Sequence, residues 1–143
     1  MPKWLKVVLI ILAAALGLCC LGSGAAYAWL YRHKDELKDA AKTASQEGRA
    51  FGKLHDAEGC VDDGLRRLRA QRGLVEQATN RMFLQACLEV AAKPEGFCRD
   101  VPARTDVVAI ATWSVQRCAA KGAAGDQDCA RLMQVVQRAC TGE

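Results

Sequence analysis

The sequence has little histidine, a residue common in catalytic and metal sites. Its only histidines are His33 and His55, and they are well separated in the chain. With only two histidines, we expect neither a zinc site nor a catalytic histidine. The sequence also lacks a Cys-x-x-Cys pair, a glycine-rich phosphate loop and a serine in a nucleophile elbow. We therefore expect a non-catalytic protein with no cofactor and no metal.

The net positive charge is also small once the N-terminal region is excluded. The net charge is +4, but Lys3, Lys6 and Arg32 flank an apolar segment, which leaves 17 of the 20 lysines and arginines against 16 acidic residues. A nearly neutral domain lacks the electrostatic attraction that nucleic acid binding requires. We expect no nucleic acid partner.

A long run without charge comes after the short basic flank at residues 1–6. Residues Val7 to Leu30 include no acidic or basic side chain, and aromatic residues lie at both ends (Trp4, Trp29 and Tyr31). As a helix the run would span roughly 36 Å, enough to cross a hydrocarbon core of about 30 Å. The aromatic residues would lie at the two interfaces. The pattern predicts a transmembrane signal-anchor helix at residues 7–31.

Two alternatives exist for this segment. Ala26-Tyr27-Ala28 matches a signal peptidase site, and cleavage there would release a secreted or periplasmic protein. We favour the anchor because the apolar run continues to Tyr31, beyond the roughly 7–15 residues that a signal peptide needs. Lipidation at Cys19 is disfavoured because Leu18 occupies a position where a small residue is expected.

The orientation of the anchor is predicted from the cysteines. Six lie C-terminal to the apolar segment: Cys60, Cys87, Cys98, Cys118, Cys129 and Cys140. An even number of cysteines in a small domain is typical of disulfides in an oxidising compartment. The positive-inside rule opposes this, because more basic residues come after the segment than before it. We give the cysteines more weight, since a segment with a basic N-terminal flank directs the C-terminal part of the chain across the membrane. We expect a single-pass protein of a bacterial inner membrane with its C-terminal domain in the periplasm.

Residues 32–56 are expected to form a helical stalk. Small residues repeat there at intervals of four: Ala40, Ala44, Gly48 and Gly52. This repeat would permit close contact with another helix. We nevertheless favour a flexible, weakly helical spacer, because each glycine costs a helix about 1 kcal/mol relative to alanine.

Residues 57–143 are expected to form a small all-α domain stapled by disulfides. Apolar residues recur at helical spacing on both sides of Gly73, which suits a C′ position between two antiparallel helices. Thr105 can cap a third helix, with Val107, Ala111, Val115 and Cys118 on one face, although the β-branched start of this segment leaves a strand as an alternative. Asp126 or Asp128 caps a last helix with a clear apolar face. That face carries Cys129, Leu132, Met133, Val136 and Cys140.

Charged residues in the first of these helices are expected to form pairs four residues apart, Asp62 with Arg66 and Asp63 with Arg67. Nearby arginines could bind an anionic group, but we interpret them as a solvated, partly paired face. These arginines are Arg66, Arg67, Arg69 and Arg72.

The hairpin geometry predicts how the cysteines pair. Cys60 and Cys87 lie almost equally far from Gly73, and Cys118 and Cys129 are equidistant from the expected turn centred between Ala123 and Ala124. This leaves Cys98 to pair with Cys140. The rival arrangement joins Cys87 with Cys98 and Cys60 with Cys140, and it requires a continuous helix through Gly73.

These features predict a membrane-anchored protein whose exported domain binds another protein. Cys20, Gly24 and Ala28 form a stripe of small residues that would permit self-association in the apolar segment, but we favour a chance occurrence, which is common in single-span anchors. The alternative is a thiol–disulfide-active protein, in which one of the cysteine pairs exchanges electrons.

Overall fold

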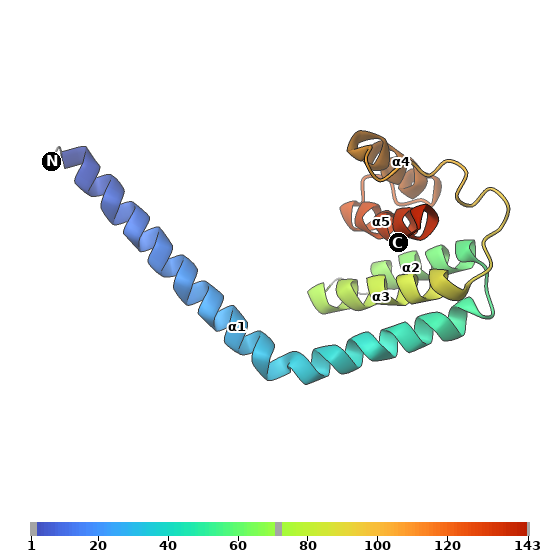
Figure 1. Ribbon diagram of the computed structural model, residues 1–143, viewed down its shortest axis with the longest axis horizontal. Coiled ribbons are helices and arrows are strands. Elements are labelled where there is room, and N and C mark those ends of the chain that lie inside the picture. Colours follow the sequence, from blue (N-terminus) through green and yellow to red (C-terminus); the bar gives the residue numbers. More distant parts are fainter. Residues whose placement is uncertain (1–2, 71–72, 143) are drawn as a thin grey trace. The chain divides into compact units, whose positions relative to one another are not determined.

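The computed structural model describes residues 3–70 and 73–142, and within them the regular elements are helices. In chain order these are α1 (Lys3–Gly52), α2 (Ala57–Ala70), α3 (Leu74–Val90), α4 (Val107–Ala120) and α5 (Gln127–Thr141) (Figure 1). An isolated β-bridge joins Asp56 to Ala92. The all-α prediction is confirmed, and the strand alternative at Val107 is wrong because helix α4 begins at that residue.

The chain divides into two compact units at Lys38 and Asp39. The first unit is the N-terminal part of α1, where aromatic side chains pack one turn apart. Tyr27 and Tyr31 stack with ring centroids 6.4 Å apart, and Trp29 contacts His33 at 4.9 Å. His33 Nδ1 also lies 2.9 Å from Glu36.

Most side chains of the expected anchor at residues 7–31 lie outside the described set, which within this range includes only the side chains of residues 8, 24, 26–29 and 31. Cys19 and Cys20 are among the omitted side chains, so the small-residue stripe is described only at Gly24 and Ala28, both exposed. Across the part of the chain that the structure describes, none of the helices combines the length and the apolar character that a membrane crossing requires.

The second unit contains residues 39–143, so part of the expected stalk belongs to the folded domain. Ala44, Gly48 and Gly52 are buried, and the two glycines lie against the backbone of α3. A Cβ atom at Gly48 would clash with the carbonyl oxygen of Phe83, and one at Gly52 would lie 2.5 Å from that of Cys87. The expectation of a weakly helical spacer is therefore corrected: the glycines weaken the helix locally but allow two helices to pack closely.

Two antiparallel hairpins make up the rest of the second unit. Helices α2 and α3 pack side by side, and so do α4 and α5, while α5 also packs against α2 and α3 (Figure 1). The core lies between the hairpins and is formed mainly by Leu65, Leu84, Leu88, Leu132, Met133 and Val136, all at most 4% exposed. Burying a side chain of this size contributes about 1.5–3 kcal/mol.

Aspartate caps explain where α4 and α5 begin. The Asp126 side chain accepts hydrogen bonds from the backbone N–H groups of Asp128 and Cys129, so it caps α5 as expected. The cap of α4 is Asp106, whose carboxylate accepts from Ala109 N–H, and not the expected Thr105. Gly73 separates α2 from α3 as predicted, but it is the N-cap of α3, in an extended conformation (φ −72°, ψ 158°) and not at a left-handed C′ position.

Candidate functional site

Three disulfides lie within the described residues, and they have the pairing expected from the hairpin geometry. Cys60 bonds Cys87, Cys118 bonds Cys129, and Cys98 bonds Cys140, with Cα–Cα distances of 5.9, 6.0 and 5.4 Å. The rival pairing of Cys87 with Cys98 is absent, because α2 and α3 fold back on each other at Gly73.

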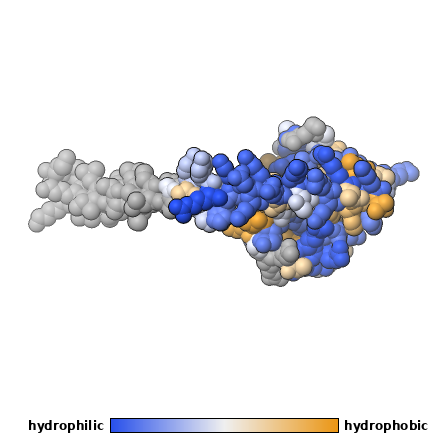
Figure 2. All heavy atoms as spheres, turned by 90° about the horizontal axis from the view of Figure 1, so that it is seen from below, coloured by the Kyte–Doolittle hydropathy of each residue, from blue (hydrophilic) through white to orange (hydrophobic). Residues whose placement is uncertain are grey.

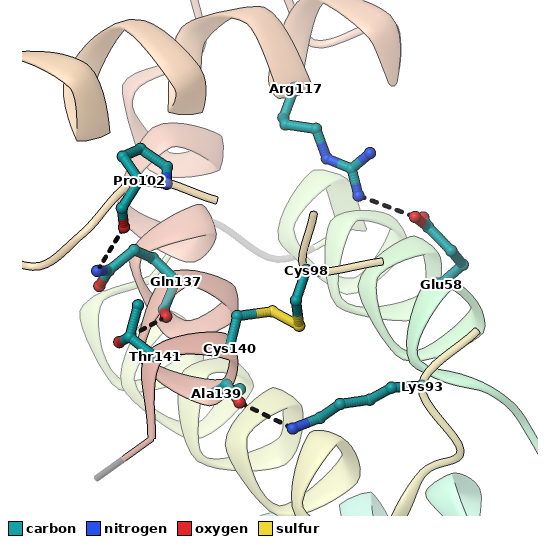
Figure 3. Close-up of a disulfide and its surroundings, with 9 residues drawn as sticks. All are labelled: Glu58, Lys93, Cys98, Pro102, Arg117, Gln137, Ala139, Cys140 and Thr141. Atoms are coloured by element: carbon teal, nitrogen blue, oxygen red, sulfur yellow. Dashed lines mark hydrogen bonds and ion pairs between the residues drawn. A yellow bond between two sulfur atoms is a disulfide. The ribbon is translucent and has the colours of Figure 1, made fainter. Parts of the chain in front are cut away.

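The three bridges differ in burial and in the elements that they join. Cys60–Cys87 ties α2 to α3 and Cys118–Cys129 ties α4 to α5, and these four cysteines are at most 1% exposed. The Cys98–Cys140 bridge is only partly buried. It ties the connecting segment 91–106, between α3 and α4, to the last turn of α5 (Figure 3).

Polar contacts hold the connecting segment beside this bridge. The Lys93 ammonium donates to the carbonyl of Ala139 at 2.8 Å, and the Gln137 side chain donates to the carbonyl of Pro102 at 3.3 Å (Figure 3). Phe97 is 7% exposed and packs against the core. A groove of about 330 Å³ lies between α3 and α5 next to these contacts. Its lining includes Leu88, Lys93, Val135 and Ala139.

Lys121, just after α4, is paired with carboxylates of α2. Its ammonium lies 2.9 Å from Glu58 and 2.7 Å from Asp62, and Arg117 donates to Glu58 at 2.8 Å. Burial alone would raise the pKa of Glu58, but the hydrogen bonds from Lys121 and Arg117 outweigh burial and hold this pKa below its usual value. For Lys121, burial opposes the charge, and the hydrogen bonds to Asp62 and Glu58 raise its pKa above the usual value. The cluster joins the two hairpins electrostatically.

Asp63 is a buried carboxylate, 5% exposed, with two arginine partners. Arg67 Nε donates to Asp63 at 2.8 Å, as the spacing predicts, and Arg66 pairs with the same carboxylate. The expected Asp62–Arg66 pair is replaced, because Asp62 contacts Lys121. Burial raises the pKa of Asp63, but the hydrogen bonds from Arg67 and Arg66 outweigh burial and leave this pKa lowered.

The predicted arginine cluster is engaged within the domain at each described position. Arg67 also donates to Glu47 at 3.0 Å and lies over the Phe83 ring, 3.8 Å from its centroid. Arg69 donates to the carbonyl of Lys121 at 2.9 Å. Arg72 lies outside the described residues. These contacts favour the interpretation of a partly paired face.

The outer face of α4 is uncharged, mostly apolar apart from the exposed Thr112 and Gln116, and uncovered within the described chain. Val107, Val108 and Val115 are 75%, 77% and 55% exposed, and Ala111 and Ala119 are exposed beside them. No charged residue occurs between Asp106 and Arg117. Helical spacing alone groups Val107, Ala111 and Val115 with Cys118 on one face. The structure corrects this grouping, because Trp113, Ser114 and Cys118 are the residues that α4 buries.

The opposite side of the domain, where α1 covers α3, is different. The face shown in Figure 2 is mostly hydrophilic, and its hydrophobic residues lie in separate areas. Arg49 lies 3.3 Å from Glu89 there, between α1 and α3. The apolar side chains of α1 and α3 on this side contact each other, as Phe51 and Phe83 do at a centroid distance of 5.8 Å.

The histidines do not come together with a nucleophile. His55 stacks on Phe51 with ring centroids 3.8 Å apart, and its Nδ1 lies 3.0 Å from the Phe51 carbonyl oxygen. His33 lies in the other unit and contacts Glu36. Within residues 3–70 and 73–142, no three side chains of His, Cys, Asp or Glu are grouped as metal ligands would be.

No protein-family model, curated protein or solved structure matches this chain. Its candidate sites therefore rest on its own residues and geometry. Two stand out: the uncovered face of α4 and the partly exposed Cys98–Cys140 bridge. The first was missed in the sequence because α4 is rich in alanine and valine all round, so its spacing alone does not identify the buried side.

Proposed function

We propose that this chain is a non-catalytic, exported membrane protein whose helical domain binds another protein through the outer face of α4. The observation that carries the proposal is the exposure of Val107, Val108 and Val115 on a helix face without charge. Fully burying a valine contributes about 1.5 kcal/mol or more. Apolar residues that are exposed side by side favour an interaction surface more than single exposed apolar residues do.

The proposed partner has an uncharged apolar surface, for example one side of an amphipathic helix. A charged residue placed against Val108 or Val115 would lose its hydration and find no opposite charge on α4. The charged groups at the C-terminal end of α4 are already paired, since Arg117 and Lys121 contact Glu58. Complementarity in polarity therefore favours an apolar partner.

The location of the protein is the second part of the proposal. The uncharged run from Val7 to Leu30 supports a membrane anchor, and the three disulfides support export to an oxidising compartment such as a periplasm. We expect protease added to cells with a permeabilised outer membrane to digest the domain while the inner membrane stays intact. Complete protection would contradict export.

Intact mass decides between an anchor and a cleaved signal peptide. We expect the chain purified from membranes to retain its residues before Trp29. A mature chain that starts at Trp29 would refute the anchor, whereas the binding surface would still be open to test.

Site-specific photo-crosslinking tests the binding surface. A photoreactive residue at Val108 or Val115 should form a discrete adduct with a second protein in intact cells, and one at Gln134, exposed on α5, should not. A photoreactive residue at Ala111, between these valines, should form the same adduct. The Val108→Asp/Val115→Asp double variant should remove the adduct formed from Ala111. Equal crosslinking from positions 108 and 134, or none from α4, would contradict the proposal.

A further inference from the structure

The Cys98–Cys140 bridge stands apart from the other two disulfides of the described chain. The other four cysteines hold the two hairpins internally and are at most 1% exposed. Cys98 and Cys140 are partly exposed, and their bridge joins the segment that leaves the first hairpin to the end of the second. One bridge therefore differs from the rest both in accessibility and in what it constrains.

Accessibility matters because thiol–disulfide exchange requires a thiolate to reach one of the sulfur atoms directly. Cys60, Cys87, Cys118 and Cys129 are enclosed by the helical core, so an external thiol reaches them only after part of the fold has opened. Cys98 lies outside the helices, in a short turn where Arg99 N–H donates to the Gly96 carbonyl at 3.1 Å. Cys98 and Cys140 are partly exposed where they pack against the edge of the core, so we expect an external thiol to reach this bridge without the core opening.

We propose that Cys98–Cys140 is a site of thiol–disulfide exchange with an external protein dithiol, and that its opening releases the connecting segment 91–106 from α5. In the first step a thiolate of the dithiol attacks one of the two sulfur atoms, breaks the S–S bond and forms a mixed disulfide. The second thiol of the dithiol then displaces the cysteine. This chain gains two thiols, and the dithiol becomes a disulfide, so that two electrons and two protons are transferred.

The structure shows what such a reduction would release. Without the bridge, the segment is held to α5 by the Lys93–Ala139 and Gln137–Pro102 hydrogen bonds, while Phe97 stays packed in the core. Both hydrogen bonds are at the surface or only partly buried, and water competes for their donors and acceptors. Both hairpins keep their own bridges, so the expected change is confined to the segment and the adjoining groove between α3 and α5.

The test is selective reduction of the full-length chain. The oxidised protein is treated with increasing dithiothreitol, free thiols are trapped with N-ethylmaleimide, and the labelled cysteines are located by peptide mapping. Cys98 and Cys140 should be labelled together and faster than the other four cysteines by roughly tenfold or more, because those four require an opening of the fold. Equal labelling rates at all six positions would overturn the proposal.

Hydrogen exchange tests the release of the segment. After selective reduction, amide exchange should accelerate at Phe97, Arg99 and Val101, while α2 and α3 around Cys60–Cys87 keep their protection. The Cys98→Ser/Cys140→Ser variant should show the same pattern without reductant, and the matched Cys118→Ser/Cys129→Ser variant should instead affect the α4–α5 turn. Fast labelling with unchanged exchange in segment 91–106 would overturn the release. Labelling of the unmodified chain tests the selective reduction of Cys98–Cys140 even if a serine variant does not fold.

This inference does not depend on the anchor or on the partner of α4. Failure of either part of the proposed function would leave the labelling experiment unchanged, and equal labelling rates would leave the crosslinking experiment unchanged.

Discussion

The two hairpins of the domain have similar internal architecture and different surroundings. Each is an antiparallel helix pair closed by one buried disulfide, Cys60–Cys87 in the first and Cys118–Cys129 in the second. The first hairpin lies between α5 and residues 39–52 of α1 (Figure 1). The second packs against the first through α5, and the outer face of α4 remains uncovered.

The difference shows what covering a helix face requires of a sequence. On α3, Gly48 and Gly52 of α1 bring two backbones close together, and Arg67 fills the adjoining space over Phe83. The outer face of α4 has no charged residue between Asp106 and Arg117, and no described segment of the chain covers it. The first hairpin is therefore covered by α1 of the same chain, whereas we propose that the α4 face of the second hairpin is covered by another protein.

Of the two hairpin disulfides, the one in the covered hairpin should have the larger effect when it is removed. Cys60→Ala/Cys87→Ala opens a loop with a sequence separation of 27, and we expect it to lower the free energy of unfolding by about 3–4 kcal/mol. Cys118→Ala/Cys129→Ala, with a separation of 11, should lose less, about 2–3 kcal/mol. Urea unfolding followed by circular dichroism measures both, and the reverse order would contradict the loop-entropy argument.

Filling the contact between α1 and α3 should come next. Gly48→Leu places a side chain against the Phe83 carbonyl, and the required backbone shift should cost about 1–3 kcal/mol. Gly24→Ala is the matched control, because a Cβ atom there meets nothing within 4 Å. The control should not reduce the free energy of unfolding. A Gly48→Leu chain as stable as the original would mean that α1 does not pack on α3 in solution.

The hairpins and their bridges were predictable because turns leave local signals. Gly73 and the Gly122–Gly125 segment lie midway between paired cysteines, and a disulfide needs Cα atoms within about 7 Å, so symmetry about each turn limited the pairing. Asp126 was an expected cap for a similar local reason. A cap depends on a side chain and the N–H groups two or three residues later.

The contacts of α1 and the rotation of α4 were not predictable in the same way. Helix propensity treats Gly48 and Gly52 as a cost of about 1 kcal/mol each, while packing against α3 depends on residues 35 positions later. Helix α4 has apolar side chains on most of its surface, so spacing does not select one side. The rotation of α4 about its own axis is set by the burial of Trp113 and Cys118. These two side chains are buried by packing against α5 and the connecting segment 91–106.

Acid should distinguish buried from exposed carboxylates on the covered hairpin. Asp63→Asn removes a buried charge that two arginines hydrogen-bond, and it should cost about 1–2 kcal/mol at neutral pH. Asp62→Asn, at a mostly exposed neighbour, should cost less than about 0.5 kcal/mol. Comparing these two variants separates the effect of burying a carboxylate from the effect of removing its charge.

The sign of the pH dependence is set by the lowered pKa of Asp63. Its folded-state pKa lies below its unfolded value, so the unfolded chain binds more protons between them. The contribution of Asp63 is therefore complete above its unfolded pKa, near pH 4, and is lost as the pH falls through the folded value. Unfolding measured between neutral and acidic pH should show the Asp63→Asn chain converging with the original at low pH. A constant difference would contradict the pKa argument.

The smallest effect is expected on the uncovered face of α4. Val108→Thr/Val115→Thr should change the free energy of unfolding by less than about 0.5 kcal/mol, because these side chains are already in water. The same replacement at Val136, which is fully buried, adds a hydroxyl to the core and should cost about 1–3 kcal/mol. A loss above about 1 kcal/mol from the α4 double variant would show that this face packs within the chain itself. In that case the two hairpins would both be covered internally, and α4 would not be the surface that contacts a partner.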